Sequence, residues 1–82
     1  MFRDFTRREA KKRGITGEVE NIHDGGVRIV AEGEEKVLYD FLSSLRVGPF
    51  FSQVEKIDTS WDVFEGTHSD FVIVYKNFFD RF

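Results

Sequence analysis

The strongest constraint on the fold of this chain is an apolar stripe within Glu34–Arg46. Its members recur at the i, i+3, i+4 spacing of a single helix face and are Val37, Leu38, Phe41, Leu42 and Leu45. Gly48-Pro49 follows, a pair that ends helices because glycine accepts the left-handed backbone and proline cannot continue the helix. The segment therefore predicts a helix of about three turns with one buried face.

Short strands are expected on both sides of this helix. Ile15–Ile22 alternates in polarity, and Asp24-Gly25-Gly26 predicts a tight hairpin turn into Val27–Glu32. After the helix, Gln53–Val63 alternates again, and Phe71–Tyr75 is rich in residues that favour strands. These patterns predict one β-hairpin before the helix and two further strands after it.

The chain opens on a second amphipathic segment, Met1–Ala10. Phe2 and Phe5 have helical spacing, and Arg13-Gly14 provides a stop, so a helix of about ten residues is expected. The predicted order is helix, strand, strand, helix, strand, strand, or αββαββ, within an α+β domain. The last seven residues, Lys76–Phe82, have no firm assignment.

Composition excludes several classes of protein. At 82 residues with 40% hydrophobic and 33% charged content, the chain is expected to form one globular domain with a core rich in its ten phenylalanines. It has no cysteine, which excludes disulfides and thiolate metal sites. A net charge of −3 argues against nucleic acid and anionic membranes as partners. With no apolar run near the ~20 residues that span a bilayer, a soluble, cytoplasmic protein is expected.

Five short motifs follow one another from Phe2 to Tyr75. They are Phe2-Arg3-x-Phe5-Thr6-x-x-x-Ala10, Gly14-Ile15-Thr16-Gly17-x-Val19-x-Asn21-x-x-Asp24-Gly25-x-Val27, Ala31-Glu32-Gly33, Gly48-Pro49 and Ser69-Asp70-Phe71-x-Ile73-x-Tyr75. In order and spacing they resemble the acylphosphatase family. The resemblance implies a ferredoxin-like α/β sandwich, with two helices on one face of a mainly antiparallel sheet. It assigns residues 1–75 to an acylphosphatase-like domain and residues 76–82 to a Phe-rich C-terminal extension.

The same resemblance implies an activity and two catalytic residues. The activity is hydrolysis of the carboxyl–phosphate bond of acyl phosphates, so a small acyl phosphate or a phosphate ion is the expected ligand, with no metal or cofactor. The catalytic arginine of the family maps onto Arg3 and its catalytic asparagine onto Asn21. A guanidinium matches phosphate oxygens and stabilises charge on the phosphoryl group, and an amide can orient the attacking water.

The sequence departs from the family pattern ahead of Phe2. The family has there a β-strand and a loop of the type Gly-x-Val-Gln-Gly-Val, whose N–H groups hold the phosphate, and neither occurs in these 82 residues. An N-terminally shortened member is therefore expected, with weak or absent hydrolysis. The alternative is a non-catalytic, self-associating domain. The gap left by a central strand can be filled by closing the sheet, by the C-terminal tail or by a second chain. A self-associated or strand-swapped homo-oligomer is favoured over a monomer.

Several residues also have purely structural interpretations. Outside the family pattern, Asn21 would serve a turn. The basic face of the first helix is expected to be solvated surface rather than a polyanion site. His23 and His68 lie in predicted turns and are expected to be surface histidines without a metal. Packing is the favoured role of Phe78, Phe79 and Phe82, with recognition of a protein partner as the alternative.

Overall fold

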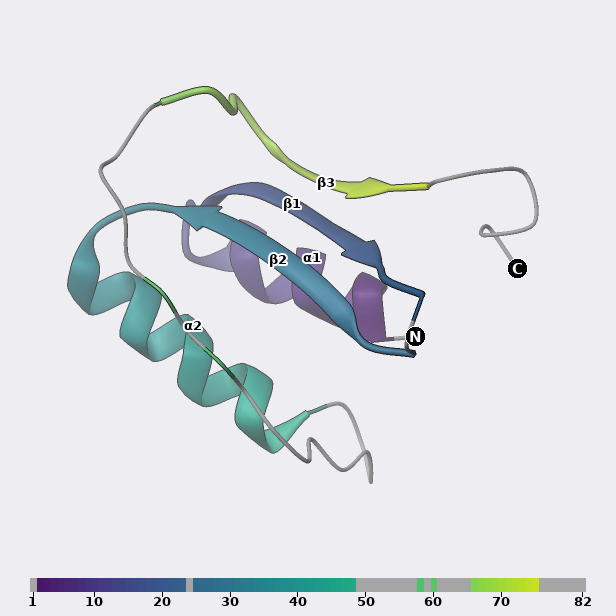
Figure 1. Cartoon of the computed structure of the whole chain (residues 1–82). Coiled ribbons are helices and arrows are strands. Elements are labelled where there is room, and N and C mark those ends of the chain that lie inside the picture. The colour runs from purple at the N-terminus through teal and green to yellow at the C-terminus, as the bar shows by residue number, and fades with distance from the viewer. Residues whose placement is uncertain (1, 24, 49–57, 59, 61–65, 76–82) are drawn as a thin grey trace.

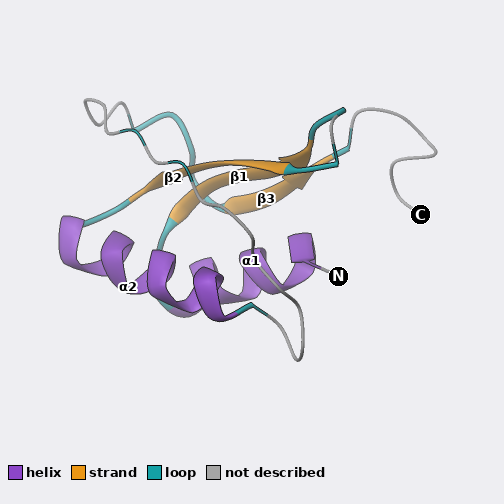
Figure 2. Ribbon diagram, turned by 60° about the horizontal axis from the view of Figure 1, so that its bottom comes forward, coloured by secondary structure: helices purple, strands orange, loops and turns teal. Residues whose placement is uncertain are grey.

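The computed structural model describes residues 2–23, 25–48, 58, 60 and 66–75. Its elements are α1 (Phe2–Lys12), β1 (Thr16–Asn21), β2 (Val27–Glu32), α2 (Glu35–Val47) and β3 (Phe71–Val74) (Figure 1). The three strands form one sheet in the order β2-β1-β3. Both helices lie on the same face of this sheet, as Figure 2 shows and as the family resemblance implies. Most of the predicted strand Gln53–Val63, and the whole tail Lys76–Phe82, lie outside the described residues.

The described sheet is mixed, although a mainly antiparallel one was expected. β1 and β2 form the predicted hairpin and pair antiparallel, from Thr16 opposite Glu32 to Asn21 opposite Val27. β3 pairs with the other side of β1 in parallel, from Gly17 beside Phe71 to Glu20 beside Val74. A tight hairpin joins antiparallel strands, whereas β3 follows α2 in the sequence, lies on the opposite side of β1 from β2 and runs in the direction of β1. β1 is therefore the central strand of the described sheet.

α1 covers β1 and β3 and also contacts α2. Thr6 and Ala10 are fully buried on its inner face, and the Thr6 hydroxyl donates to the Phe2 carbonyl at 2.8 Å. α1 ends at Lys12 and is followed by Gly14, which has a φ of +68°, while the Ile15 N–H returns to the Ala10 carbonyl at 3.0 Å. This left-handed cap turns the chain back so that β1 runs antiparallel to α1.

The core lies between the two helices and β1 with β3. Its buried residues are Ala10, Ile15, Val19, Phe41, Leu45 and Phe71. The rings of Phe41 and Phe71 meet edge to face, with centroids 6.1 Å apart, and thereby join α2 to β3. The predicted apolar stripe is thus confirmed at its two most buried members, Phe41 and Leu45. α2 ends as predicted at Gly48, whose φ is +74° and whose N–H donates to the Ser44 carbonyl.

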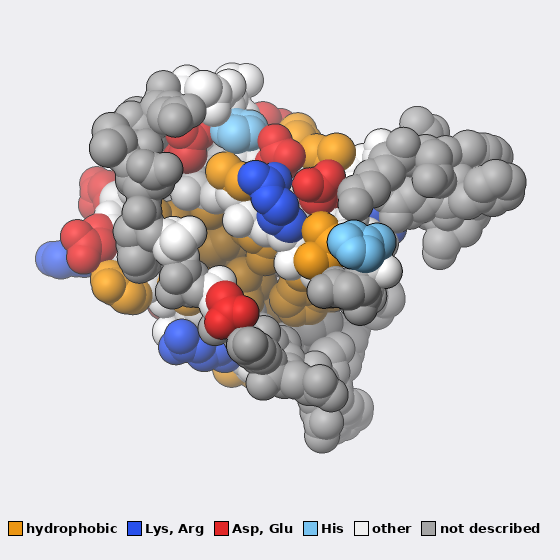
Figure 3. All heavy atoms as spheres, in the orientation of Figure 1, with side chains coloured by type: hydrophobic (Ala, Val, Ile, Leu, Met, Phe, Trp, Pro, Cys, Tyr) orange, Lys and Arg blue, Asp and Glu red, His pale blue; other side chains and the backbone are white. Residues whose placement is uncertain are grey.

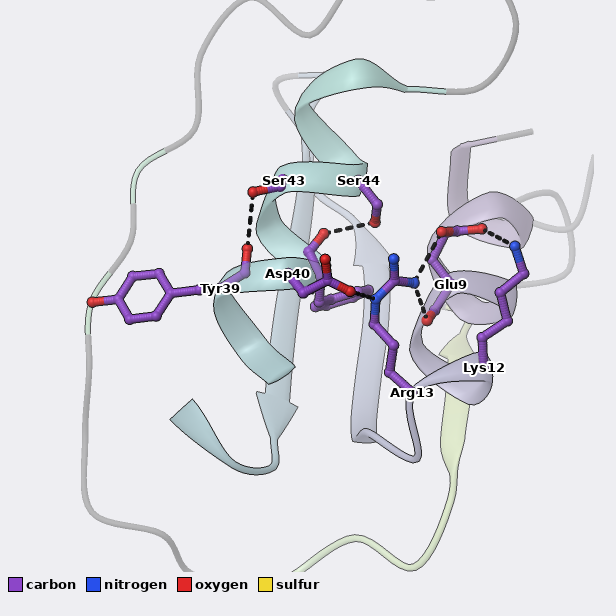
Figure 4. A network of polar contacts seen from close by, with 8 residues as sticks. Glu9, Lys12, Arg13, Tyr39, Asp40, Ser43 and Ser44 are labelled. Atoms are coloured by element: carbon purple, nitrogen blue, oxygen red, sulfur yellow. Dashed lines mark hydrogen bonds and ion pairs between the residues drawn. The ribbon is translucent and has the colours of Figure 1, made fainter. Parts of the chain in front are cut away.

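An ion-pair network also links the two helices (Figure 4). Arg13 donates from Nε to Asp40 Oδ2 at 2.7 Å and from Nη1 to Glu9 Oε1 at 2.9 Å. Asp40 and then Glu9 raise the pKa of Arg13. Lys12, which donates to Glu9 Oε2, acts with Arg13 to hold the pKa of Glu9 below its usual value. The network fixes the loop after α1 against the side of α2.

The edge of β2 away from β1 has no strand beside it among the described residues. Half-buried apolar side chains line the inner side of this edge and the facing side of α2, namely Val27, Ile29, Ala31, Val37 and Leu38. Apolar side chains are visible between β2 and α2 in Figure 3. This is the position at which the family resemblance implies a further central strand. Neither described helix is long and apolar enough to span a membrane.

Candidate active site

The two predicted catalytic residues lie at one end of the sandwich. Arg3 is in the first turn of α1, and Asn21 is the last residue of β1. Because α1 and β1 are antiparallel, the start of the helix lies beside the end of the strand, and the parallel β3 also ends there (Figures 1 and 2). The topology therefore brings two residues that are 18 positions apart to the same edge of the fold.

Arg3 is held in place by its neighbours in α1. Phe2 and Phe5 pack against the core with ring centroids 6.1 Å apart, and the bond from Thr6 to the Phe2 carbonyl closes the first turn. The Arg3 side chain is half-buried, and its Nη1 atom is fully buried. A third residue in a chain is prone to fraying, but here aromatic packing anchors it.

Tyr75 joins Arg3 at this end. The Arg3 Cζ atom lies 5.0 Å from the centroid of the Tyr75 ring, within the range of a cation–π interaction. Since Glu20 pairs with Val74, the register also brings the backbone of Tyr75 next to Asn21. Tyr75 belongs to the last of the five motifs, but the motif alone gave it no role. Only the parallel pairing of β1 and β3 reveals that it lies beside both predicted site residues.

Asn21 is half-buried, pairs with Val27 across the hairpin and immediately precedes the turn. The turn is closed by the Ile22 N–H, which donates to the Gly26 carbonyl at 3.0 Å, and by Gly25, whose φ is +91°. This tight connection fixes where the strand ends and hence where the amide is presented. The sequence-based expectation of a hairpin at this point is confirmed.

The chemistry available at this end suits an anion. The start of α1, with the positive end of its helix dipole, lies at this end of the fold, and its first turn carries the positive charge of Arg3 as well as the carboxylate of Asp4. The Asn21 amide can donate to or accept from a bound water. The described residues contain no cluster of three or more His, Cys, Asp or Glu that could hold a metal ion.

His68 is the polar residue whose surroundings differ most from the expectation. Instead of an isolated surface histidine, the ring contacts two carboxylates, with Nε2 3.0 Å from Glu18 Oε1 and Nδ1 3.0 Å from Glu32 Oε1. The partners lie 50 and 36 positions away in the sequence, so no local pattern could have indicated the contacts. This cluster lies near the start of β3, whereas Arg3, Asn21 and Tyr75 lie at its end.

Comparisons with known proteins agree with the family resemblance. The family model for acylphosphatase matches residues 1–73. An acylphosphatase of Dehalococcoides mccartyi strain 195 is 40% identical over 75 residues, which cover 90% of this chain and 82% of that protein. One from Thermotoga petrophila is 43% identical over 74 residues, covering 90% of this chain and 81% of the relative.

The fold agrees as well. The crystal structure of acylphosphatase from Bacillus subtilis superposes with a TM-score of 0.85 at 40% identity, covering 90% of this chain and 82% of that one. The two helices and the mixed sheet described above thus have counterparts in an experimentally determined structure. On the family model, the relatives and the fold together, this chain belongs to the acylphosphatase family.

Proposed function

We propose that the end of the sandwich formed by Arg3, Asn21 and Tyr75 is a site for acyl phosphate hydrolysis. The observation that carries this proposal is the convergence of Arg3 and Asn21 at one end of the fold, in a chain that belongs to the acylphosphatase family. The products would be a carboxylate and inorganic phosphate. No metal or cofactor enters the proposed reaction.

The roles of the two residues follow from their chemistry. The Arg3 guanidinium binds the phosphoryl oxygens and stabilises the charge that spreads over them in the transition state. The Tyr75 ring restricts where this guanidinium can lie. The Asn21 amide orients a water for attack on phosphorus in line with the departing carboxylate. Neither group has to gain or lose a proton for this task.

We further propose that turnover by these 82 residues alone is weak or absent. A Gly-x-Val-Gln-Gly-Val loop does not occur in the sequence. Each preorganised donor removed from a site of developing charge typically costs about 10²–10³ in rate, so losing several would severely reduce hydrolysis.

The activity is tested by measuring hydrolysis of a small acyl phosphate with the purified chain in molar excess over this substrate. Turnover that falls by about 10²-fold or more in both Arg3→Ala and Asn21→Ala would support the proposed site. Arg8→Ala is the matched control, because Arg8 is an exposed cation on the same helix. No difference between the original chain and Arg3→Ala, in samples that fold by circular dichroism, would contradict catalysis by this chain.

A second candidate function, self-association, is favoured by the edge of β2. The Gly17 N–H donates to the Asp70 carbonyl at 2.9 Å, so the backbone groups of Gly17 point toward β3. Because these groups alternate along a strand, those of Glu18 and its partner Val30 point toward each other. The N–H and carbonyl groups of Ile29 and Ala31 then point away from β1, where they can pair with another strand.

We propose that the occupant of this edge is β2 of a second copy, paired antiparallel about Val30. In that register Arg28 of each copy faces Glu32 of the other, and Ile29 forms a hydrogen-bonded pair with Ala31. The charge pattern of the strand is thus complementary to itself. Arg28→Glu would place like charges opposite each other. The dimer of this variant, measured by light scattering, should therefore dissociate at a higher protein concentration than the dimer of the original chain. A monomeric original chain at high concentration would refute this second function.

A further inference from the structure

A histidine and two glutamates connect three separate segments on the outer face of the sheet. Glu18 projects from the middle of β1 and Glu32 from the end of β2, while His68 belongs to the segment that leads into β3. Their side chains are 27%, 10% and 20% exposed, respectively, so all three are substantially shielded from solvent. We refer to these three residues as the His68 cluster.

Backbone hydrogen bonds strengthen the attachment at Glu32. The Gly66 N–H donates to Glu32 Oε2 at 2.9 Å, and the His68 N–H donates to Glu32 Oε1 at 3.3 Å. The Thr67 hydroxyl lies 3.1 Å from His68 Nδ1. One carboxylate therefore holds two residues ahead of β3, Gly66 and His68, which flank Thr67. Without these bonds, the described contacts of residues 66–68 with β2 would be lost.

The geometry requires a particular protonation state of the ring. A neutral imidazole has one N–H donor and one acceptor nitrogen, whereas the imidazolium ion donates from both. Each ring nitrogen of His68 faces a carboxylate oxygen at 3.0 Å. A neutral ring could satisfy only one of these carboxylates and would direct a lone pair at the other. The ring therefore donates to both carboxylates only when it is protonated.

We infer that the His68 cluster is a proton-operated latch that fastens residues 66–70, and with them the start of β3, onto β1 and β2. In the closed state the imidazolium bridges Glu18 and Glu32. When the ring loses its proton, one of the two bridging bonds is lost and the segment opens more often. This device goes beyond the proposed function, since it concerns the other end of β3 from Arg3 and Tyr75.

The pKa shifts agree with this geometry. Hydrogen bonds to Glu18 and then to Glu32 raise the pKa of His68. The His68 ring, followed by the backbone N–H groups of Gly66 and His68, lowers the pKa of Glu32. A raised histidine pKa means that the stabilisation is complete below the unfolded value of about 6.5 and is lost as pH rises through the folded value. A lowered glutamate pKa means that stabilisation is lost as pH falls through the folded value of Glu32. The latch is therefore closed between these two limits.

Other charges near the cluster are already paired. On β1 the next residue on the outer face, Glu20, accepts from Arg28 of β2 at 3.4 Å. On the segment itself, Asp70 accepts from the Phe71 N–H at 2.8 Å and lies 3.5 Å from Lys11 of α1. The Phe71 N–H, followed by Lys11, keeps the pKa of Asp70 low. Glu18 and Glu32 are thus the described charged groups that contact the His68 ring.

A titration followed by NMR on the full chain tests the first half of this inference. The ring C–H signals of His68 and His23 are recorded against pH in the original chain and in Glu18→Gln and Glu32→Gln. The His68 midpoint should lie above 6.5 in the original chain and fall in both variants. Glu20→Gln is the matched control, because Glu20 is on the same face of β1 but bonds to Arg28 instead. A His68 midpoint that is the same in all four proteins would overturn the inference.

Hydrogen exchange tests the second half. The Gly17 N–H bonds to the Asp70 carbonyl and so reports whether the start of β3 is in place. Its protection, corrected for intrinsic exchange, should fall between pH 6 and pH 9 in the original chain but remain constant in His68→Gln. The two measurements are linked thermodynamically. For each pH unit by which the folded chain raises the His68 midpoint, the protection of the Gly17 N–H should fall about tenfold across this pH range. Protection that does not change with pH in the original chain would refute the latch, even if Glu32→Gln fails to fold.

Discussion

Replacing Gly17 with alanine tests the closest backbone approach within the sheet. Gly17 has a φ of +145°, and a Cβ built there would collide with the carbonyl oxygen of Val30 and lie 2.8 Å from its carbonyl carbon. Real Cβ atoms do not approach backbone so closely, so the paired strands β1 and β2 would have to separate locally. Gly14 is the matched control, since it also has a positive φ but would meet no atom within 4 Å.

The magnitude follows from the difference between these two glycines. Strain from the positive φ costs about 1–2 kcal/mol at Gly14, in the left-handed region, and about 1–3 kcal/mol at Gly17, whose larger φ is suited almost only to glycine. Overpacking against rigid backbone adds about 1–3 kcal/mol at Gly17 alone. For a domain of this size the total stability is about 4–12 kcal/mol, so the added cost is a large fraction of it. We expect Gly17→Ala to unfold roughly 8–16 °C below Gly14→Ala if the added cost is about 2 kcal/mol.

Urea and thermal unfolding followed by far-UV circular dichroism provide the assay. The free energy of unfolding should fall in the order original chain, Gly14→Ala, Gly17→Ala. Equal destabilisation by the two substitutions would show that only the backbone angle matters and that the approach of Val30 does not. Because Gly17 also donates to the Asp70 carbonyl, loss of β3 pairing should accompany the larger effect.

Three further substitutions test the core, the helix contact and the site. Phe41→Ala should cost about 3–5 kcal/mol in urea unfolding, because a buried ring is removed, and a loss below 1 kcal/mol would contradict its place in the core. Arg13→Gln should cost about 1 kcal/mol at neutral pH, where Glu9 is ionised. Because the pKa of Glu9 is lowered, this difference should shrink as pH falls through that lowered pKa, and a difference that stays constant over a full acid titration would argue against the ion pairs. Tyr75→Leu should weaken binding of inorganic phosphate about two- to fivefold by NMR titration, whereas unchanged binding would show that its contact with Arg3 does not position the guanidinium.

Local patterns were sufficient for most of the described elements. The spacing of apolar residues predicted α2 and its end at Gly48, and the glycine turn predicted the hairpin between β1 and β2. These features depend on neighbours within a few positions, so the sequence carries them directly. The proposed roles of Arg3 and Asn21 came from motif resemblance, which names the residues without placing them in space.

Contacts between distant segments required the tertiary structure. The parallel pairing of β1 with β3 made the described sheet mixed, and it placed Tyr75 beside Arg3 at the end where Asn21 lies. The same pairing brought His68 to two glutamates on different strands. Each of these contacts joins residues separated by tens of positions, and their energies depend on which strands become neighbours. The sequence alone therefore determined the helices, the hairpin and the family, whereas the assembled sheet decided which charged and aromatic side chains meet.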